Sequence, residues 1–90
     1  MVIEFDAEKD AAKIRKHGIS LARFAYMAGR LMAADLAHSQ REPRWNVIGM
    51  IDQRVYAAVV TYRGVTIRVI SLRAASRKER QHYGEATKQG

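Results

Sequence analysis

The sequence predicts an α+β fold, with two helices first, an antiparallel sheet next and a third helix last. Three observations indicate this order. Capped amphipathic segments fill the first third of the chain, apolar residues recur with a period of two over residues 44–72, and a capping box marks a helix start at Ser76. Ninety residues are near the lower end of domain size, so residues 1–90 are expected to form a single domain.

The first segments have the patterns of a short strand and a helix. Residues 2–5 alternate weakly in hydropathy and could form the strand. Asp6 can accept hydrogen bonds from the amides of a first helical turn, and residues 7–16 carry apolar side chains at helical spacing. Gly18 supplies the left-handed residue that ends this helix.

A second helix is predicted over residues 21–28, with Ser20 as its N-cap and Gly29 after its end. The two helices are expected to cover one face of the sheet. Residues 30–38 are ambiguous, because they could form a short strand or continue the helix. The polar segment 38–43 contains the only proline of the chain and is expected to be a loop.

Three strands rich in β-branched and aromatic residues are predicted next, over residues 44–51, 54–62 and 65–72. Two short turns should connect them. Arg63-Gly64 has the composition of a two-residue hairpin turn, and Asp52-Gln53 is a weaker candidate. The three strands should therefore be neighbours in the sheet.

Two-residue turns fix which side chains share a face of this sheet. One face should pack on the helices, and it collects Trp45, Val47, Gly49, Tyr56, Ala58, Val60, Ile67, Val69 and Ser71. The other face should carry Arg68 next to an apolar strip that consists of Ile48, Met50, Ile70 and Leu72. On this register Arg54 lies opposite Arg73, and Arg68 and Arg73 point to opposite faces. A bulge around residues 71–72 would bring both arginines to one face.

The last helix is expected over residues 76–84, because Ser76 and Glu79 have the spacing of a capping box. Four arginines lie on either side of this helix start, at positions Arg68, Arg73, Arg77 and Arg80. Guanidinium groups arranged in this way suit a polyanion that is held by forked hydrogen bonds.

The charge balance points to a phosphate-rich partner. Sixteen Lys and Arg against nine Asp and Glu give a net charge of +7 and a pI near 10.3. The chain has no cysteine, which excludes disulfides and Cys-ligated zinc and fits a reducing cytoplasm. The histidines share no metal-ligand spacing, so no metal or other cofactor is expected. No long apolar run or signal peptide is present, so no membrane contact is expected.

Short motifs along the chain resemble those of the BrnT-type toxins of type II toxin–antitoxin systems. The family pattern R-I-I-S-A-R-x-A followed by E-R-x-x-Y is similar to Arg68-Val69-Ile70-Ser71-Leu72-Arg73-Ala74 followed by Glu79-Arg80 and Tyr83. Further matches are Lys16-His17-Gly18-Ile19-Ser20, Arg44-Trp45, Ile48-Gly49 and Thr61-Tyr62-Arg63-Gly64. The resemblance extends over nearly the whole chain.

This resemblance implies a RelE-like α+β fold, a ribonuclease activity and a BrnA-type antitoxin as protein partner. In that family, toxin and antitoxin form a complex that represses its own promoter, and the antitoxin reads the operator DNA. The resemblance therefore implies an RNA substrate, a hetero-oligomer with the antitoxin, and contact with DNA only through that complex.

A ribonuclease without a metal ion would let the RNA 2′-OH attack the adjacent phosphorus. Arg68 and Arg73 are the candidates for stabilising the negative charge that develops on the phosphoryl oxygens. Substrate contacts are expected from Arg44, Tyr62, Arg77 and Arg80. Candidates for proton transfer are His82, Tyr83 and Glu79.

Each of these assignments has a structural alternative. Arg68 could be a solvated sheet residue, Arg73 could form an ion pair at the helix entry, and Glu79 fits the capping box better than a general base. Arg77 and Arg80 could form a solvated helix face. A different function is also open, namely a basic module that binds nucleic acid or completes a repressor complex without cleaving RNA.

Overall fold

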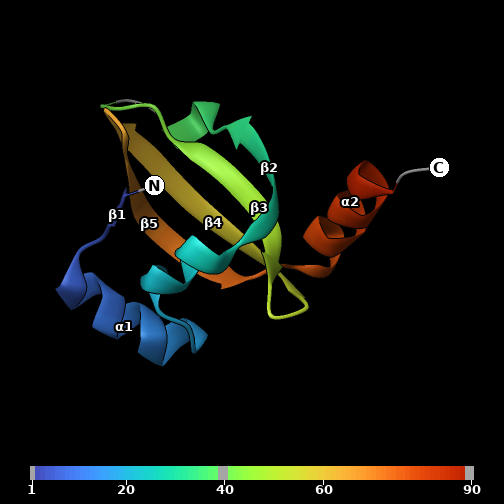
Figure 1. The fold of residues 1–90 in the computed structure, drawn as a ribbon, viewed down its shortest axis with the longest axis horizontal. Coiled ribbons are helices and arrows are strands. Elements are labelled where there is room, and N and C mark those ends of the chain that lie inside the picture. Colours follow the sequence, from blue (N-terminus) through green and yellow to red (C-terminus); the bar gives the residue numbers. More distant parts are fainter. Residues whose placement is uncertain (1, 39–40, 89–90) are drawn as a thin grey trace.

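A five-stranded sheet forms the centre of the molecule (Figure 1). The computed structural model describes residues 2–38 and 41–88, and its elements are β1 (Val2–Glu4), α1 (Ala7–His17), the 3₁₀ helix η1 (Leu21–Tyr26), β2 (Ala28–Ala34), the 3₁₀ helix η2 (Leu36–His38), β3 (Trp45–Ile51), β4 (Arg54–Arg63), β5 (Thr66–Ala74) and α2 (Arg77–Thr87). The strand order is β1-β5-β4-β3-β2. Neighbouring strands are antiparallel except β1, which runs parallel to β5. The predicted mixed α+β class is confirmed.

Helix α1 begins and ends at the residues that the sequence indicates. The Asp6 carboxylate accepts hydrogen bonds from the backbone N–H groups of Glu8 and Lys9, at 2.9 and 3.1 Å. Gly18 has a φ of 75° and donates its N–H to the carbonyl of Ile14, which closes the last turn. Local hydrogen bonds therefore fix both ends of α1, although none of its side chains is buried.

The second predicted helix, over residues 21–28, is wrong in type and length. The chain forms the six-residue 3₁₀ helix η1, and its buried side chains, Leu21 and Phe24, are three residues apart, as the period of a 3₁₀ helix requires. Residues 28–34 then form β2, which resolves the ambiguous segment as a strand paired with β3. Cross-strand pairing decides this outcome over helix propensity. Of the predicted loop 38–43, residues 39 and 40 lie outside the described part.

The β3–β4 register agrees with the two-residue turn at Asp52-Gln53. Trp45 lies opposite Val60, and Ile51 lies opposite Arg54. Both turn residues have positive φ values, 48° and 67°, as a mirror-image hairpin turn requires. Asp52 is also ion-paired with Arg23 of η1, which ties the turn to the helical layer.

The β4–β5 register differs from the prediction in two respects. Arg63 pairs with Thr66, so the connecting residues are Gly64 and Val65 instead of Arg63-Gly64. In addition, Val60 pairs with Val69 while Val59 pairs with Ser71, which leaves Ile70 as the extra residue of a β-bulge. The bulge was predicted one residue further along the chain. Every residue of β5 after the bulge therefore points to the opposite face of the sheet from the face predicted.

The bulge corrects several assignments after residue 70. Leu72 is fully buried in the core and does not belong to the outer apolar strip. Ser71 is half-buried and leaves the core face. Arg73 lies opposite Ala57, so the predicted opposition of Arg54 and Arg73 does not occur. The inserted residue reverses the faces of Ser71 and Leu72, because side chains alternate between faces at every position. The shifted hairpin turn and the bulge together move Arg73 from Arg54 to Ala57.

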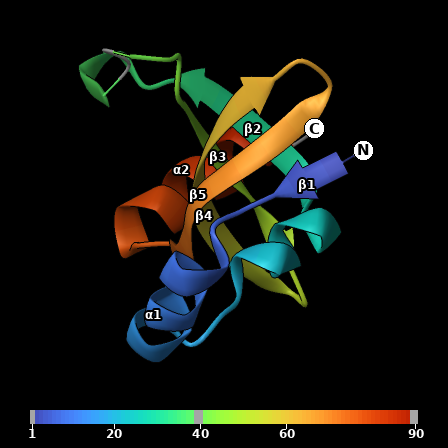
Figure 2. The same cartoon turned by 90° about the vertical axis from the view of Figure 1, so that its left-hand side faces the viewer.

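The core lies between one face of the sheet and η1, which contributes Leu21 and Phe24, whereas α1 beside it has no buried side chain (Figure 2). Its buried side chains are Leu21, Phe24, Met27, Val47, Ile51, Ala58, Val60, Ile67, Val69 and Leu72, and Trp45 packs against them while remaining partly exposed. Helix α2 contacts β3 and β4 instead and projects from the body of the molecule in Figure 1. In the part of the chain that the structure describes, α2 contacts the opposite face of the sheet, called the outer face below, where Glu79 lies beside Asn46 and Ile48.

Candidate functional site

The bulge in β5 places Arg68 and Arg73 on the same face of the sheet. Arg68 lies opposite Thr61 and Arg73 lies opposite Ala57. Because Thr61 and Ala57 are four residues apart on one strand, both face the outer side. At a strand rise of roughly 3.3 Å per residue, the two backbone positions are about 13 Å apart. The arginines share a face, but they line two separate hollows.

Arg68 lines an open hollow of about 250 Å³ that is rich in basic side chains. Four basic side chains from four parts of the chain contribute to it, namely Lys9 of α1, Arg44, Arg63 of β4 and Arg68 of β5. The carboxylates that also line it are those of Asp6 and Glu42. Lys9 and Arg63 were not among the residues proposed from the sequence. Neither stands out there, because the packing of α1 brings Lys9 to Arg68 and the pairing of β4 with β5 brings Arg63 to it.

The ion pairs in this hollow are long and shared. Arg68 Nη1 lies 3.4 Å from Glu4 Oε1, and Arg63 Nη1 lies 3.5 Å from the same oxygen. Arg63 also approaches Glu42, at 3.6 Å. Four basic side chains, against the carboxylates of Glu4, Asp6 and Glu42, leave the hollow with one excess positive charge. Arg68 keeps 29% of its side chain exposed, so a further anion can reach it.

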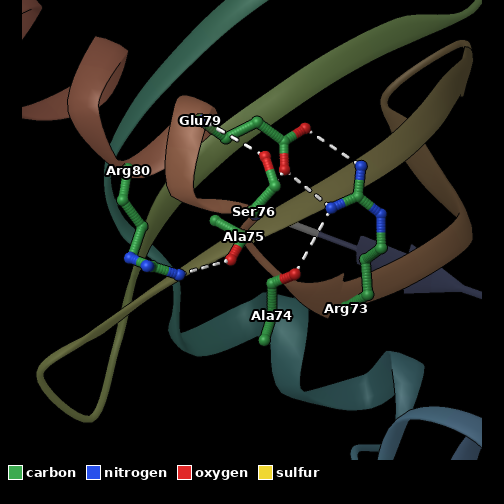
Figure 3. Close-up of polar contacts among 6 residues, drawn as sticks. All are labelled: Arg73, Ala74, Ala75, Ser76, Glu79 and Arg80. Atoms are coloured by element: carbon green, nitrogen blue, oxygen red, sulfur yellow. Dashed lines mark hydrogen bonds and ion pairs between the residues drawn. The ribbon is translucent and has the colours of Figure 1, made fainter.

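Arg73 is held in a tight cluster where β5 leads into α2 (Figure 3). Its Nη1 and Nη2 atoms donate to the two carboxylate oxygens of Glu79, at 2.7 and 2.9 Å. Glu79 Oε1 also accepts the backbone N–H of Ser76 at 2.8 Å, and the Glu79 N–H donates to Ser76 Oγ. The capping box predicted at Ser76 is therefore present, and Arg73 is joined to it.

These hydrogen bonds decide the protonation state of Glu79. The donation from Arg73, followed by that from the Ser76 backbone, lowers the pKa of Glu79 from 4.5 to about 2. Glu79 is thus ionised at neutral pH and is a weak proton acceptor there. Its observed contacts are those of the structural alternative, a capping partner that also forms an ion pair with Arg73.

The arginines on α2 point in different directions. Arg80 turns back to the junction, where its Nη1 donates to the carbonyl oxygen of Ala75 at 3.0 Å (Figure 3). Arg77 is exposed on the first turn. Arg44 lines the Arg68 hollow, as a substrate contact would require. Of these three residues, Arg44 is therefore the one that lies beside Arg68.

The hydroxyl groups of the two tyrosine candidates contact β2. Tyr83 is 8% exposed, and its Oη donates to the Gly29 carbonyl oxygen of β2 at 2.9 Å. Tyr62 lies opposite Ile67, a core-face residue, and its Oη contacts the Met32 sulfur. These contacts give Tyr83 a packing role and place Tyr62 on the other side of the sheet from Arg68.

Two histidines remain as titratable groups near the junction. His82 is exposed on α2. His17, at the end of α1, is half-buried, and its pKa is lowered by burial and by the charges of Lys13, Lys16 and Arg73. The imidazole is therefore neutral at pH 7 and lies within electrostatic reach of Arg73. The sequence alone does not connect His17 with Arg73, because the two residues lie far apart along the chain.

Over residues 2–38 and 41–88, no three His, Cys, Asp or Glu side chains gather in a group that could hold a metal ion. Within those same ranges, every helix is too short or too polar to span a bilayer.

One comparison with known proteins gives a match. A family model described as "Ribonuclease toxin, BrnT, of type II toxin-antitoxin system" matches residues 5–79 of the 90-residue chain. A search of the curated proteins finds no match. The matched range contains Lys9, Arg44, Arg63, Arg68 and the Arg73–Glu79 pair.

Proposed function

Because this chain belongs to the BrnT family of ribonuclease toxins of type II toxin–antitoxin systems, we propose that it is a metal-independent endoribonuclease that inhibits translation and growth. The observation that carries the catalytic part is the β5 bulge, which sets Arg68 and Arg73 on one face of the sheet. An RNA strand that crosses this outer face meets both guanidinium groups.

In the proposed reaction, the RNA 2′-oxygen attacks the adjacent phosphorus and the bond from phosphorus to the 5′-oxygen breaks. The products are a 2′,3′-cyclic phosphate and a 5′-hydroxyl. Arg68 donates hydrogen bonds to the phosphoryl oxygens, on which negative charge increases in the transition state. Its long, shared contacts with Glu4 make it easier to redirect than Arg73, so we place the scissile phosphate in the Arg68 hollow.

Arginine stays protonated and cannot move the two protons that this reaction transfers. One proton leaves the 2′-OH, and one is added to the 5′-oxygen. Imidazole is the side chain best suited to these transfers, so the two to compare are His82, the candidate from the sequence, and His17, whose pKa is lowered by burial and by nearby charges that include Arg73. Comparing His17→Asn and His82→Asn, which remove one imidazole each, shows which of the two is needed for cleavage.

The partner of the toxin is proposed to be a BrnA-type antitoxin in a hetero-oligomer located in the cytoplasm. Contact with operator DNA would then occur through the antitoxin. We expect the antitoxin to cover the outer face, either over Ile48, Met50 and Ile70 or over the Arg68 hollow. The net charge of +7 favours an acidic partner surface at that place. An interface confined to α1 would contradict this part of the proposal.

The test is a cleavage assay with purified protein and single-stranded RNA in excess EDTA. We expect cleavage to continue in EDTA and its products to carry cyclic phosphate and 5′-hydroxyl ends. Full inhibition by EDTA that added Mg²⁺ reverses would contradict the metal-independent mechanism. Binding of RNA with a steep salt dependence but without cleavage would instead identify a non-enzymatic binding module.

A further inference from the structure

The Arg73 guanidinium forms a bidentate ion pair on the outer face of the sheet. Its two terminal nitrogens donate in parallel to the two oxygens of Glu79, at 2.7 and 2.9 Å (Figure 3). A phosphodiester presents two non-bridging oxygens to arginine in the same forked geometry and carries the same single negative charge. Glu79 therefore binds the same two N–H donors of Arg73 that an RNA phosphate would bind.

We propose that the Arg73 guanidinium is a second phosphate-binding subsite for RNA, and that Glu79 occupies it in the free protein as an internal substitute for the phosphate. When RNA binds, a backbone phosphate replaces the Glu79 carboxylate on Arg73. The inference rests on the proposed function, since it requires RNA to cross the outer face. Glu79 would then weaken the affinity of the toxin for RNA, because it competes with the phosphate for Arg73.

The local structure allows this exchange without unfolding α2. Glu79 keeps its place when Arg73 leaves, because its Oε1 atom also accepts the Ser76 N–H at 2.8 Å and its own N–H donates to Ser76 Oγ. Only the Arg73 side chain has to move. It is 45% exposed, and an ion pair at such a position contributes little net stability.

The position of the subsite also suits a strand that already contacts Arg68. Arg73 and Glu79 line a small hollow on the outer face together with Asn46, Ile48 and Ser71. The two arginines are about 13 Å apart along the sheet, at the rise of a β-strand. Each guanidinium would therefore contact a different phosphate of the same RNA strand.

The decisive variant is Glu79→Gln, and its matched control is Glu85→Gln on the same helix. Both remove one negative charge, but Glu85 is an exposed residue outside the cluster. Glutamine also serves in a capping box, so α2 should form in both variants. We expect Glu79→Gln to tighten binding of a non-cleavable 2′-O-methyl oligonucleotide about 3- to 10-fold, measured by fluorescence anisotropy at fixed salt. Glu85→Gln should change it less than about 2-fold.

The same comparison in an Arg73→Gln background tests whether the effect passes through the guanidinium group. There, we expect Glu79→Gln to bind no more tightly than Glu85→Gln. Equal effects of the two glutamate variants in the wild-type background would overturn the subsite. An advantage of Glu79→Gln that persists without Arg73 would overturn it as well. Neither outcome affects the cleavage assay, so the proposed ribonuclease function fails or stands separately.

A measurement on the wild-type protein makes the test independent of any variant. During titration with the oligonucleotide, the NMR signals of the Arg73 guanidinium and the Glu79 carboxyl carbon should shift together. Oligonucleotide binding that leaves both signals unchanged would contradict the exchange.

Discussion

At the scale of single residues, Glu79 connects strand β5 to the first turn of α2. It joins the capping box of α2 to the Arg73 side chain, and its pKa is lowered to about 2 by these donors. A carboxyl group whose pKa is lower in the folded state stabilises the fold at pH values above its unfolded pKa. The contribution is then lost as the pH falls towards the folded value.

This pKa predicts how the stability of Glu79→Gln depends on pH. At pH 7 the variant should be less stable than wild type by about 1 kcal/mol, because Arg73 is half-exposed and solvent screens the pair. The difference should be complete above about pH 4.5 and should disappear as the pH approaches about 2. Urea unfolding at pH 7, 4 and 2.5 measures it. A difference that stays constant over this range would contradict the assignment.

Two glycines give opposite predictions for the same substitution. A Cβ at Gly49 would lie 2.8 Å from the Ala28 carbonyl oxygen and would also overlap the Met27 side chain, so Gly49→Ala should destabilise the fold by about 1–3 kcal/mol. Gly84 lies inside α2, and a Cβ there meets nothing within 4 Å. Gly84→Ala should therefore stabilise by about 0.5–1 kcal/mol. Thermal unfolding compares the two, and equal effects would refute the explanation.

At the scale of elements, the β5 bulge decides which side chains can act together. The alternation of residues along the strand predicts opposite faces for Arg68 and Arg73, and one inserted residue at Ile70 reverses this. The parity conflict between the two arginines indicates from the sequence that a bulge is needed. Its position, and hence the burial of Leu72, depends on pairing with β4, which the sequence of β5 alone does not contain.

Helix α2 is held to the body of the molecule by few contacts. Tyr83 is its one buried side chain in the described residues, and its Oη donates to the Gly29 carbonyl oxygen. We expect Tyr83→Phe to destabilise the protein by about 1 kcal/mol through loss of this hydrogen bond, and to raise hydrogen exchange selectively in α2. RNA cleavage should remain. Loss of cleavage with α2 still protected would instead identify Tyr83 as a proton donor.

At the scale of the whole molecule, the sequence predicts the fold class better than it predicts the layer on the core face. The caps at Asp6 and Ser76 and the period of two in the strands depend on local chemistry, and they agree with the structure. The second helix is wrong, and residues 30–38 are ambiguous in the sequence, because the pairing with β3 that forms β2 lies outside local sequence.

The candidate site shows the same limit. The sequence identifies Arg68, Arg73 and Glu79 as a group, since they are close along the chain. It does not identify Lys9 or Arg63, which reach Arg68 only through the packing of α1 and the pairing of β4 with β5. Nor does it show that the two arginines face different carboxylates. Those contacts depend on how β1 and α2 pack against β5.

The most direct test of the central claim is the rate of RNA cleavage by Arg68→Ala against that by Arg15→Ala. Each variant removes one positive charge, but Arg15 is an exposed residue in the last turn of α1 and does not line the Arg68 hollow. With circular dichroism unchanged in both, we predict that Arg68→Ala lowers the rate constant about 10²- to 10³-fold and that Arg15→Ala changes it less than about 3-fold. Cleavage by Arg68→Ala at the rate of Arg15→Ala would contradict the proposal that the scissile phosphate lies in the Arg68 hollow.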